Sequence, residues 1–136
     1  MPEPELTRSL RRIVAVRTVP KGAALAQRVR LCRGFGGKFL GLMFRSNLDR
    51  EEGALLVYTQ ASRSLTSIHM FFVPFPLGVF WLDSQGKVID RVRALPWRPY
   101  YAPSVPAWYV LELHPAALDV LPIGECVEFY ETDPRA

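Results

Sequence analysis

The sequence predicts a mainly β fold: a compact β-sandwich, a jelly roll or a small barrel, with about eight strands and one or two short helical segments. Three observations support this prediction. The 136 residues are 49% hydrophobic and 12% aromatic, which is typical of a packed globular core. Twelve prolines and nine glycines divide the chain at short intervals, as short strands joined by turns require. Between these breaks the apolar residues alternate with polar ones or form short runs, as in half-buried and fully buried strands.

The expected strands follow one another along the chain, separated by glycine, proline or polar turns. They lie at residues 8–18, 28–33, 55–58, 68–73, 77–82, 88–94, 107–113 and 125–131. Ser84–Lys87 is expected to form a hairpin turn, and the four prolines within residues 95–106 predict a long, stiff loop. Phe39, Leu42 and Met43 have i, i+3, i+4 spacing, which predicts a helical turn, and a second is expected within residues 115–121.

Length and charge limit the organisation and the partners. The length predicts one domain over residues 1–136. Residues 1–50 hold eleven Lys and Arg against three Asp and Glu, a charge of +8, whereas residues 51–136 hold six against ten, a charge of −4. A basic half can bind nucleic acid, but its arginines also suit outward strand positions that the acidic half neutralises. A basic patch alone is weak support, so the sequence disfavours a nucleic-acid partner.

The cysteines and the N-terminus bear on metals, disulfides and compartment. Cys32 and Cys126 lie in no CxxC motif, and with His69 and His114 they match no zinc-site spacing. We therefore expect no metal and no cofactor, and two free thiols rather than a disulfide. The N-terminal segment lacks the basic and apolar regions of a signal peptide, which favours a cytoplasmic protein. The longest apolar run, residues 68–82, is too short and too rich in proline to span a membrane as a helix.

Three polar residues are candidates for a ligand site. His69 lies inside an apolar run, where it serves either as a general base or pocket hydrogen-bonder, or as a core histidine bonded to a carbonyl. Arg45 either clamps an anion or pairs with Asp83, Glu112 or Asp49. Alternation places Glu112 on the strand face opposite Leu111 and Leu113, where it is either solvated or, if buried, in need of a partner.

The proline-rich loop is the most suggestive surface feature. Trp97, Arg98, Tyr100 and Tyr101 are residue types enriched at recognition hot spots, and loops on a rigid β scaffold are common binding sites. The alternative is a lid whose aromatic rings pack over one end of the core. The candidate ligand-binding residues are therefore Arg45, His69, Trp97, Arg98, Tyr101 and Glu112, and no residue is assigned a catalytic role.

The order of several segments resembles a known family. These are Gly41–Arg45 and Glu51–Gly53, Ile68–Phe72 with Phe75–Leu77, Val79–Asp83 with Gly86–Val88, Leu95–Arg98, and Val110–Leu113. Together they resemble the bacterial and archaeal family called domain of unknown function 192, over about residues 25–130. The resemblance implies a β-sandwich-like domain and brings no activity, substrate or cofactor. Many members have an aspartate where this chain has Gly78, and a basic residue where it has Pro74.

Three hypotheses about function follow. The first is a small non-enzymatic binding or accessory module that presents the aromatic and arginine loop to a small ligand or a protein partner. The second is a hydrolase-like enzyme that uses His69 with Glu112 or Asp83, and Arg45 as an anion clamp. The third is weak nucleic-acid binding through the arginine-rich half. No G-x-S-x-G, G-x-G-x-x-G or Walker motif is present in the sequence, which favours the first.

Overall fold

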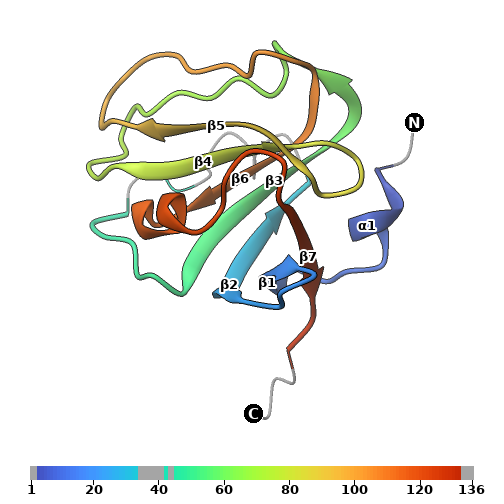
Figure 1. Ribbon diagram of the computed structural model, residues 1–136. Coiled ribbons are helices and arrows are strands. Elements are labelled where there is room, and N and C mark those ends of the chain that lie inside the picture. The colour runs from blue at the N-terminus through green and yellow to red at the C-terminus, as the bar shows by residue number, and fades with distance from the viewer. Residues whose placement is uncertain (1–2, 34–41, 43–44, 133–136) are drawn as a thin grey trace.

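The structure is a computed structural model that describes residues 3–33, 42 and 45–132. Its strands form one sheet in the order β5-β4-β6-β3-β2-β1-β7 (Figure 1). The strands are β1 (Ile13–Val19), β2 (Ala24–Cys32), β3 (Glu52–Ser62), β4 (Leu77–Leu82), β5 (Val88–Ala94), β6 (Ala107–Leu113) and β7 (Cys126–Tyr130). A short helix, α1 (Glu5–Arg8), precedes β1, and a 3₁₀ helix, η1 (Pro115–Asp119), lies between β6 and β7. The neighbours β2 and β3 are parallel, and the other neighbouring pairs are antiparallel.

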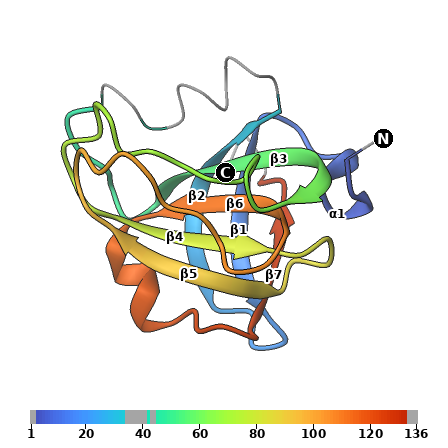
Figure 2. The same cartoon turned by 90° about the horizontal axis from the view of Figure 1, so that it is seen from above.

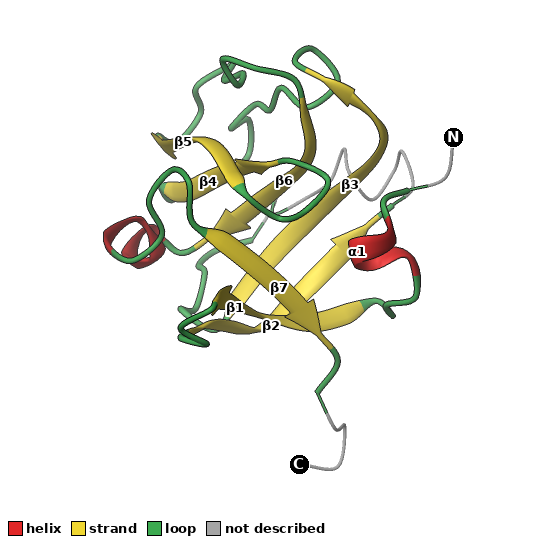
Figure 3. Cartoon of the chain, turned by 45° about the vertical axis from the view of Figure 1, so that its right-hand side comes forward, coloured by secondary structure: helices red, strands yellow, loops and turns green. Residues whose placement is uncertain are grey.

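The sheet curls into a half-barrel, so that β7 at one edge meets the turn between β4 and β5 at the other (Figure 3). Lys87 and Cys126 form an isolated bridge, and the Val127 amide donates to the Gly86 carbonyl at 2.9 Å. Gly86 has a φ of 88°, and a Cβ there would lie 2.5 Å from the Val127 carbonyl oxygen. A glycine is required at this turn because any side chain would separate the two edges.

The two faces of the sheet carry two separate apolar cores. The inner face of the curl buries alternate residues of every strand, including Leu55, Phe80 and Leu111. The intervening residues of β3, β4 and β6, such as Leu56 and Trp81, enter a second core on the outer face. The three central strands β3, β4 and β6 are therefore apolar on both faces, which is why their sequences show short runs rather than simple alternation.

The outer core is covered by two loops, residues 63–76 and 95–106, which we call the flap (Figures 1 and 2). The loops run side by side and are joined through backbone groups: Ile68 and Tyr101 exchange two hydrogen bonds of 2.8 and 2.9 Å. The Met70 amide donates to the Arg98 carbonyl at 2.7 Å, and the Met70 carbonyl accepts from the Trp97 amide at 2.9 Å. The indole of Trp81 donates to the Thr66 carbonyl at 2.7 Å, which fixes the flap to β4.

The structure confirms the mainly β prediction and corrects some of its details. Strands 77–82, 88–94 and 107–113 have the predicted bounds, while the strands expected at 28–33 and 55–58 extend over Ala24–Cys32 and Glu52–Ser62. The prediction of a strand at 68–73 is wrong, because this segment forms half of the flap and pairs only through Ile68. Helix α1 was not predicted. Of the expected turn at Phe39–Met43, only Leu42 is within the described residues, and it is buried in the outer core.

Candidate functional site

The outer surface of the flap gathers exposed apolar side chains. In the described part of the chain, eleven large apolar side chains are exposed, and seven of them belong to the flap. These seven are Leu65, Phe71, Phe72, Leu95, Trp97, Tyr100 and Val105. The inward side chains of the same loops, among them Ile68 and Met70, fill the outer core. The flap thus has an anchoring side and an exposed side, which we call the aromatic surface.

Two neighbouring residues of the aromatic surface adopt an uncommon backbone conformation. Phe72 and Trp97 have φ angles of 61° and 66°, in the left-handed region that bulky residues rarely occupy. Their rings meet edge to face, with centroids 5.2 Å apart and planes at 63°. Such a conformation costs on the order of 1–3 kcal/mol per residue and is frequent at binding sites. Here it holds two large rings at the surface, with Trp97 53% exposed.

The flap holds four of the six predicted site residues, and they play different parts. Trp97 and Arg98 are exposed. His69 is half-buried, and its Nδ1 accepts a hydrogen bond of 3.1 Å from the Phe71 amide, so this nitrogen carries no proton in the bonded state. The Tyr101 hydroxyl accepts from the Leu95 amide at 2.9 Å. His69 and Tyr101 therefore brace the loops, whereas Trp97 and Arg98 face solvent.

Arg45 and Asp83 serve local structure. Arg45 forms an ion pair with Glu52. The predicted partners, Asp83, Glu112 and Asp49, are therefore wrong. The Asp83 carboxylate accepts from the Gln85 and Lys87 amides at 2.8 and 2.9 Å, which stabilises the predicted hairpin turn that follows it.

Glu112 is a buried carboxyl group in the outer core. Glu112 lies on the strand face opposite Leu111 and Leu113, as alternation predicts. This face is covered, so the alternative that Glu112 is solvated is wrong. Only 6% of the residue is exposed, and burial raises the pKa of its carboxyl group to about 7, with the charge of Arg30 acting in the opposite direction. The register places Ala54 of β3 between Arg30 of β2 and Glu112 of β6.

Two further titratable groups share this part of the outer core. Burial, reinforced by the nearby Glu112 charge, raises the pKa of Tyr58 to about 12. Burial also raises the pKa of the Cys32 thiol, although Arg30 acts against it. Both side chains therefore remain protonated and uncharged around neutral pH, and Glu112 is the member of this group that titrates there.

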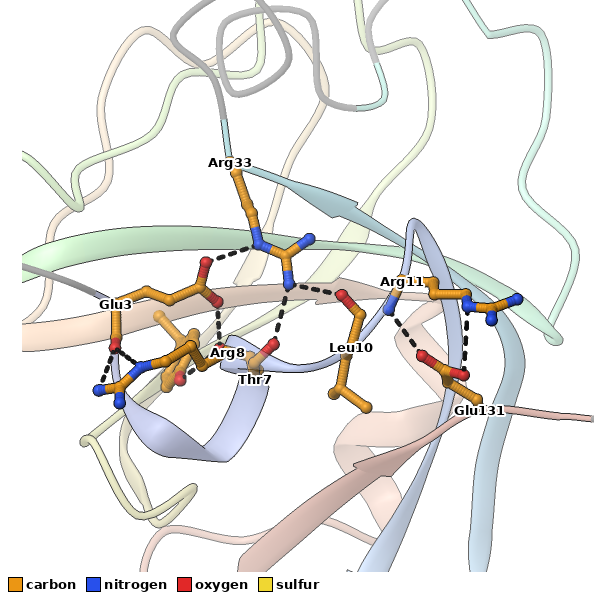
Figure 4. A network of polar contacts seen from close by, with 8 residues as sticks. Glu3, Thr7, Arg8, Leu10, Arg11, Arg33 and Glu131 are labelled. Atoms are coloured by element: carbon orange, nitrogen blue, oxygen red, sulfur yellow. Dashed lines mark hydrogen bonds and ion pairs between the residues drawn. The ribbon is translucent and has the colours of Figure 1, made fainter.

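The N-terminal segment is held by a polar network centred on Arg33 (Figure 4). Its guanidinium contacts the Glu3 carboxylate at 2.6 Å and the carbonyls of Thr7 and Leu10, both at 2.8 Å. The Thr7 hydroxyl hydrogen-bonds to Glu3 and to the buried Tyr109 hydroxyl, each at 2.8 Å. This arginine serves the fold rather than an external anion.

Other arginines of the basic half pair with the acidic half, as predicted for them. Arg17 forms an ion pair with Glu128, and Arg11 contacts Glu131 at 3.8 Å.

A groove of about 470 Å³ lies next to α1, between the N-terminal segment and the β4–β5 turn. It is lined by Glu3, Pro4, Glu5, Leu6, Arg8, Ser84, Gln85 and Trp108, and none of the six predicted site residues is among them.

Metal and membrane features can be stated for the described residues. Within them, no three His, Cys, Asp or Glu side chains gather in a way that could hold a metal ion. Cys32 and Cys126 are both free thiols, of which Cys32 is buried and Cys126 is half-buried. The helices of this part of the chain are too short and too polar to cross a bilayer.

Sequence reasoning missed part of the aromatic surface. Phe71, Phe72 and Tyr100 were not proposed as site residues, and for Phe71 and Phe72 the reason is that residues 68–73 were taken for a buried strand. A usable signal was present: residues 63–76 and 95–106 contain no Lys, Asp or Glu at all. A long apolar segment with several prolines and few charged residues also suits a loop that covers a sheet.

The fold defines the class of protein before any relative is considered: a small half-barrel of one curled sheet with a two-loop cover on its outer face. The chain belongs to the family DUF192, described as "Uncharacterized ACR", whose model matches residues 16–128.

Relatives and solved structures agree with this assignment. A UPF0127 protein of Thermococcus sibiricus is 32% identical over 118 residues, covering 85% of this chain and 75% of the relative. A UPF0127 protein of Pyrococcus furiosus is 34% identical over 94 residues, covering 69% and 78%. A protein of unknown function from Novosphingobium aromaticivorans has a similar crystal structure, with a TM-score of 0.74, 25% identity and coverage of 85% and 84%. A "putative transcription regulator" from Sinorhizobium meliloti matches with a TM-score of 0.76, 21% identity and coverage of 85% and 92%, which speaks for the fold alone.

Proposed function

We propose that this protein is a non-enzymatic binding module that captures a protein partner through the aromatic surface of its flap. The observation that carries the proposal is the gathering of seven exposed apolar side chains on two loops that contain two arginines and no Lys, Asp or Glu. Enrichment in aromatic residues and Arg, with depletion of Lys, Glu and Asp, is the composition of protein–protein interfaces. An apolar patch exposed on one face is likewise typical of an interaction site.

The anchoring of the flap supports the same proposal. Backbone hydrogen bonds between the loops and the Trp81–Thr66 contact hold the exposed rings in place before any partner arrives. Binding then costs less conformational entropy than it would for a mobile loop. Phe72 and Trp97 are each the third residue of a hydrogen-bonded turn, Met70–Val73 and Leu95–Arg98, a position where a left-handed φ is needed and glycine is usual. An exposed aromatic ring at each of these two positions favours a role for the displayed rings.

The hydrolase hypothesis has less support. It requires His69, Arg45 and an acidic residue to converge in one pocket. Instead His69 bonds within its own loop, Arg45 pairs with Glu52, and Asp83 caps its own turn. Glu112 has the raised pKa that a general acid or base needs, but a raised pKa also follows from burial alone.

The test is a selection of binding peptides from a random displayed library on the purified protein. We expect the selected peptides to bind at least about tenfold more weakly to a Phe72→Ser/Trp97→Ser variant, a loss of about 1.4 kcal/mol or more. The matched control is Val120→Ser/Ile123→Ser, which removes two exposed apolar side chains outside the flap and should leave binding unchanged. Peptides that bind both variants equally, or a collapse in melting temperature of the flap variant, would contradict the proposal.

A further inference from the structure

The charge of the flap indicates the chemistry of its partner. Arg63 and Arg98 are exposed, and the two loops contain no carboxylate to neutralise them. This differs from the basic half of the chain, where Arg17 and Arg33 pair with acidic residues. The Asp90 carboxylate of β5 contacts the flap at the Ser104 amide, at 2.8 Å, so the two arginines leave the flap with a net positive charge but not without any acidic neighbour.

The backbone pairing of the two loops places Arg63 at one end of the aromatic surface and Arg98 next to the Phe72–Trp97 pair. The Arg98 carbonyl accepts a hydrogen bond from the Met70 amide, and Arg98 directly follows the exposed Trp97 in the sequence. The Arg63 guanidinium donates to the Pro103 carbonyl at 3.1 Å. Between these positions the loops are joined by the Ile68–Tyr101 bridge. A ligand that follows the flap from Arg63 therefore meets one cation, passes the Ile68–Tyr101 bridge, and meets the second cation beside the Phe72–Trp97 pair.

We propose that the partner is an acidic polypeptide segment in which carboxylates are interspersed with apolar or aromatic residues, a proposal that rests on the binding function proposed above. The apolar side chains of the segment pack on the Phe72–Trp97 pair and its apolar neighbours, which supplies the hydrophobic part of the affinity. Its carboxylates accept hydrogen bonds from the guanidinium groups of Arg98, beside this pair, and of Arg63, and these contacts fix register and orientation.

Two other anionic partners fit these observations less well. Nucleic-acid affinity comes mainly from many phosphate contacts, and the flap offers two cations among seven exposed apolar residues. Binding to an anionic bilayer typically uses clustered lysines and arginines, and the flap has no lysine. A surface dominated by apolar side chains that carries two arginines matches a polypeptide best.

The experiment measures the affinity of the full chain for three labelled peptides by fluorescence polarisation. Each has the same apolar centre of leucine, phenylalanine and proline, flanked on both sides by glutamates, by glutamines or by lysines. We expect the glutamate peptide to bind about tenfold or more tightly than the glutamine peptide at low salt, and this advantage to shrink as salt screens the charges. The lysine peptide should bind weakest.

Charge-reversal variants locate the effect on the flap. Arg98→Glu and Arg63→Glu should each remove most of the preference for glutamate. The matched control is Arg93→Glu: Arg93 is also exposed, but by strand alternation it points to the face opposite Val92 and Ala94, which belong to the outer core. Arg93→Glu should leave the preference within about twofold of the unchanged protein, since exposed charges on another face are largely screened.

The outcomes separate this inference from the proposed function. Equal affinity for the three peptides, all lost in Phe72→Ser/Trp97→Ser, would overturn the acidic partner and leave the binding function standing. If none of the peptides binds, including those selected from the library, both the acidic partner and the binding function are overturned. Tighter binding to vesicles of phosphatidylserine and phosphatidylcholine, or to an oligothymidylate, than to the glutamate peptide would also overturn the polypeptide partner.

Discussion

The inner and outer faces of the sheet are built from the same strands but differ in what covers them. The inner face is closed by the curl of the sheet together with η1 and the N-terminal segment, and the buried polar groups there include the hydroxyls of Tyr109 and Thr7. The outer face is closed only over β3, β4 and β6, by loops, and it buries Glu112, Cys32 and Tyr58 among its apolar residues. The inner core packs the strands against one another, whereas the outer core anchors the flap that carries the aromatic surface. The inner core and the proposed binding surface therefore lie on opposite sides of one sheet.

The largest expected effect compares Phe80 on the inner face with Trp81 on the outer face. Each is fully buried, so Phe80→Ala and Trp81→Ala should each lower the free energy of unfolding by about 3–5 kcal/mol. Only Trp81→Ala also removes the Thr66 contact that fixes the flap. Hydrogen exchange should therefore show flap amides such as Met70 opening below the global unfolding free energy in Trp81→Ala. The same separation in Phe80→Ala would contradict the division between faces.

The second prediction uses the buried acid of the outer face. The ordinary pKa of a glutamate, 4.5, is the value in the unfolded chain, and burial raises that of Glu112 to about 7 in the fold. The folded state therefore holds the proton more tightly, and stability falls as pH rises from about 4.5 to 7. In Glu112→Gln this part of the decline disappears. Relative to the unchanged protein, the variant should gain about 2–3 kcal/mol between these pH values, as measured by urea unfolding.

The pH dependence has a built-in control. Tyr58 and Cys32 face the same part of the outer core, and their raised pKa values keep them neutral between pH 4.5 and 7. Arg30 keeps its charge throughout. A stability difference between Glu112→Gln and the unchanged protein that does not vary with pH would show that Glu112 titrates normally and is not buried as described.

The third prediction tests how tightly the inner face is packed. A Cβ on Gly53 would lie 2.5 Å from the Glu112 carbonyl oxygen and 2.7 Å from Leu113 Cδ2, so Gly53→Ala should cost about 1–3 kcal/mol. At Gly78 the nearest atoms are 3.2 and 3.3 Å away and belong to the side chains of Phe80 and Leu118. Gly78→Ala should therefore cost less, on the order of 1 kcal/mol. The reverse order in thermal unfolding would refute the register of β3 against β6.

The smallest effect is expected at the exposed side of the flap. Phe72→Gly removes an edge-to-face contact worth about 1 kcal/mol. It also removes a conformational cost of similar size, because glycine adopts the left-handed φ of this position without strain. The free energy of unfolding should change by less than about 1 kcal/mol, while peptide binding is lost. A loss as large as that of Trp81→Ala would mean that Phe72 belongs to the core rather than to the aromatic surface.

Local pattern predicted the elements whose environment is uniform. Strands Leu77–Leu82, Val88–Ala94 and Ala107–Leu113 have the bounds that the pattern predicts, and the hairpin turn predicted between the first two is present. The segment 68–73 was mistaken for a strand because an apolar run reads the same whether it lies inside a sheet or on top of one. Trp97 and Arg98 were chosen from residue type and loop context alone, and both are exposed on the flap.

Glu112 shows most clearly what the sequence determines and what only the tertiary structure determines. The sequence determined which strand face it occupies, because alternation is a property of the strand itself. Only the tertiary structure decided whether that face meets water or a second core, because the cover comes from loops that are distant in sequence. The sequence likewise determined a β-rich fold and an aromatic, arginine-bearing loop. Which of those rings anchor and which are displayed depends on the backbone pairing of residues 63–76 with 95–106, which no local pattern encodes.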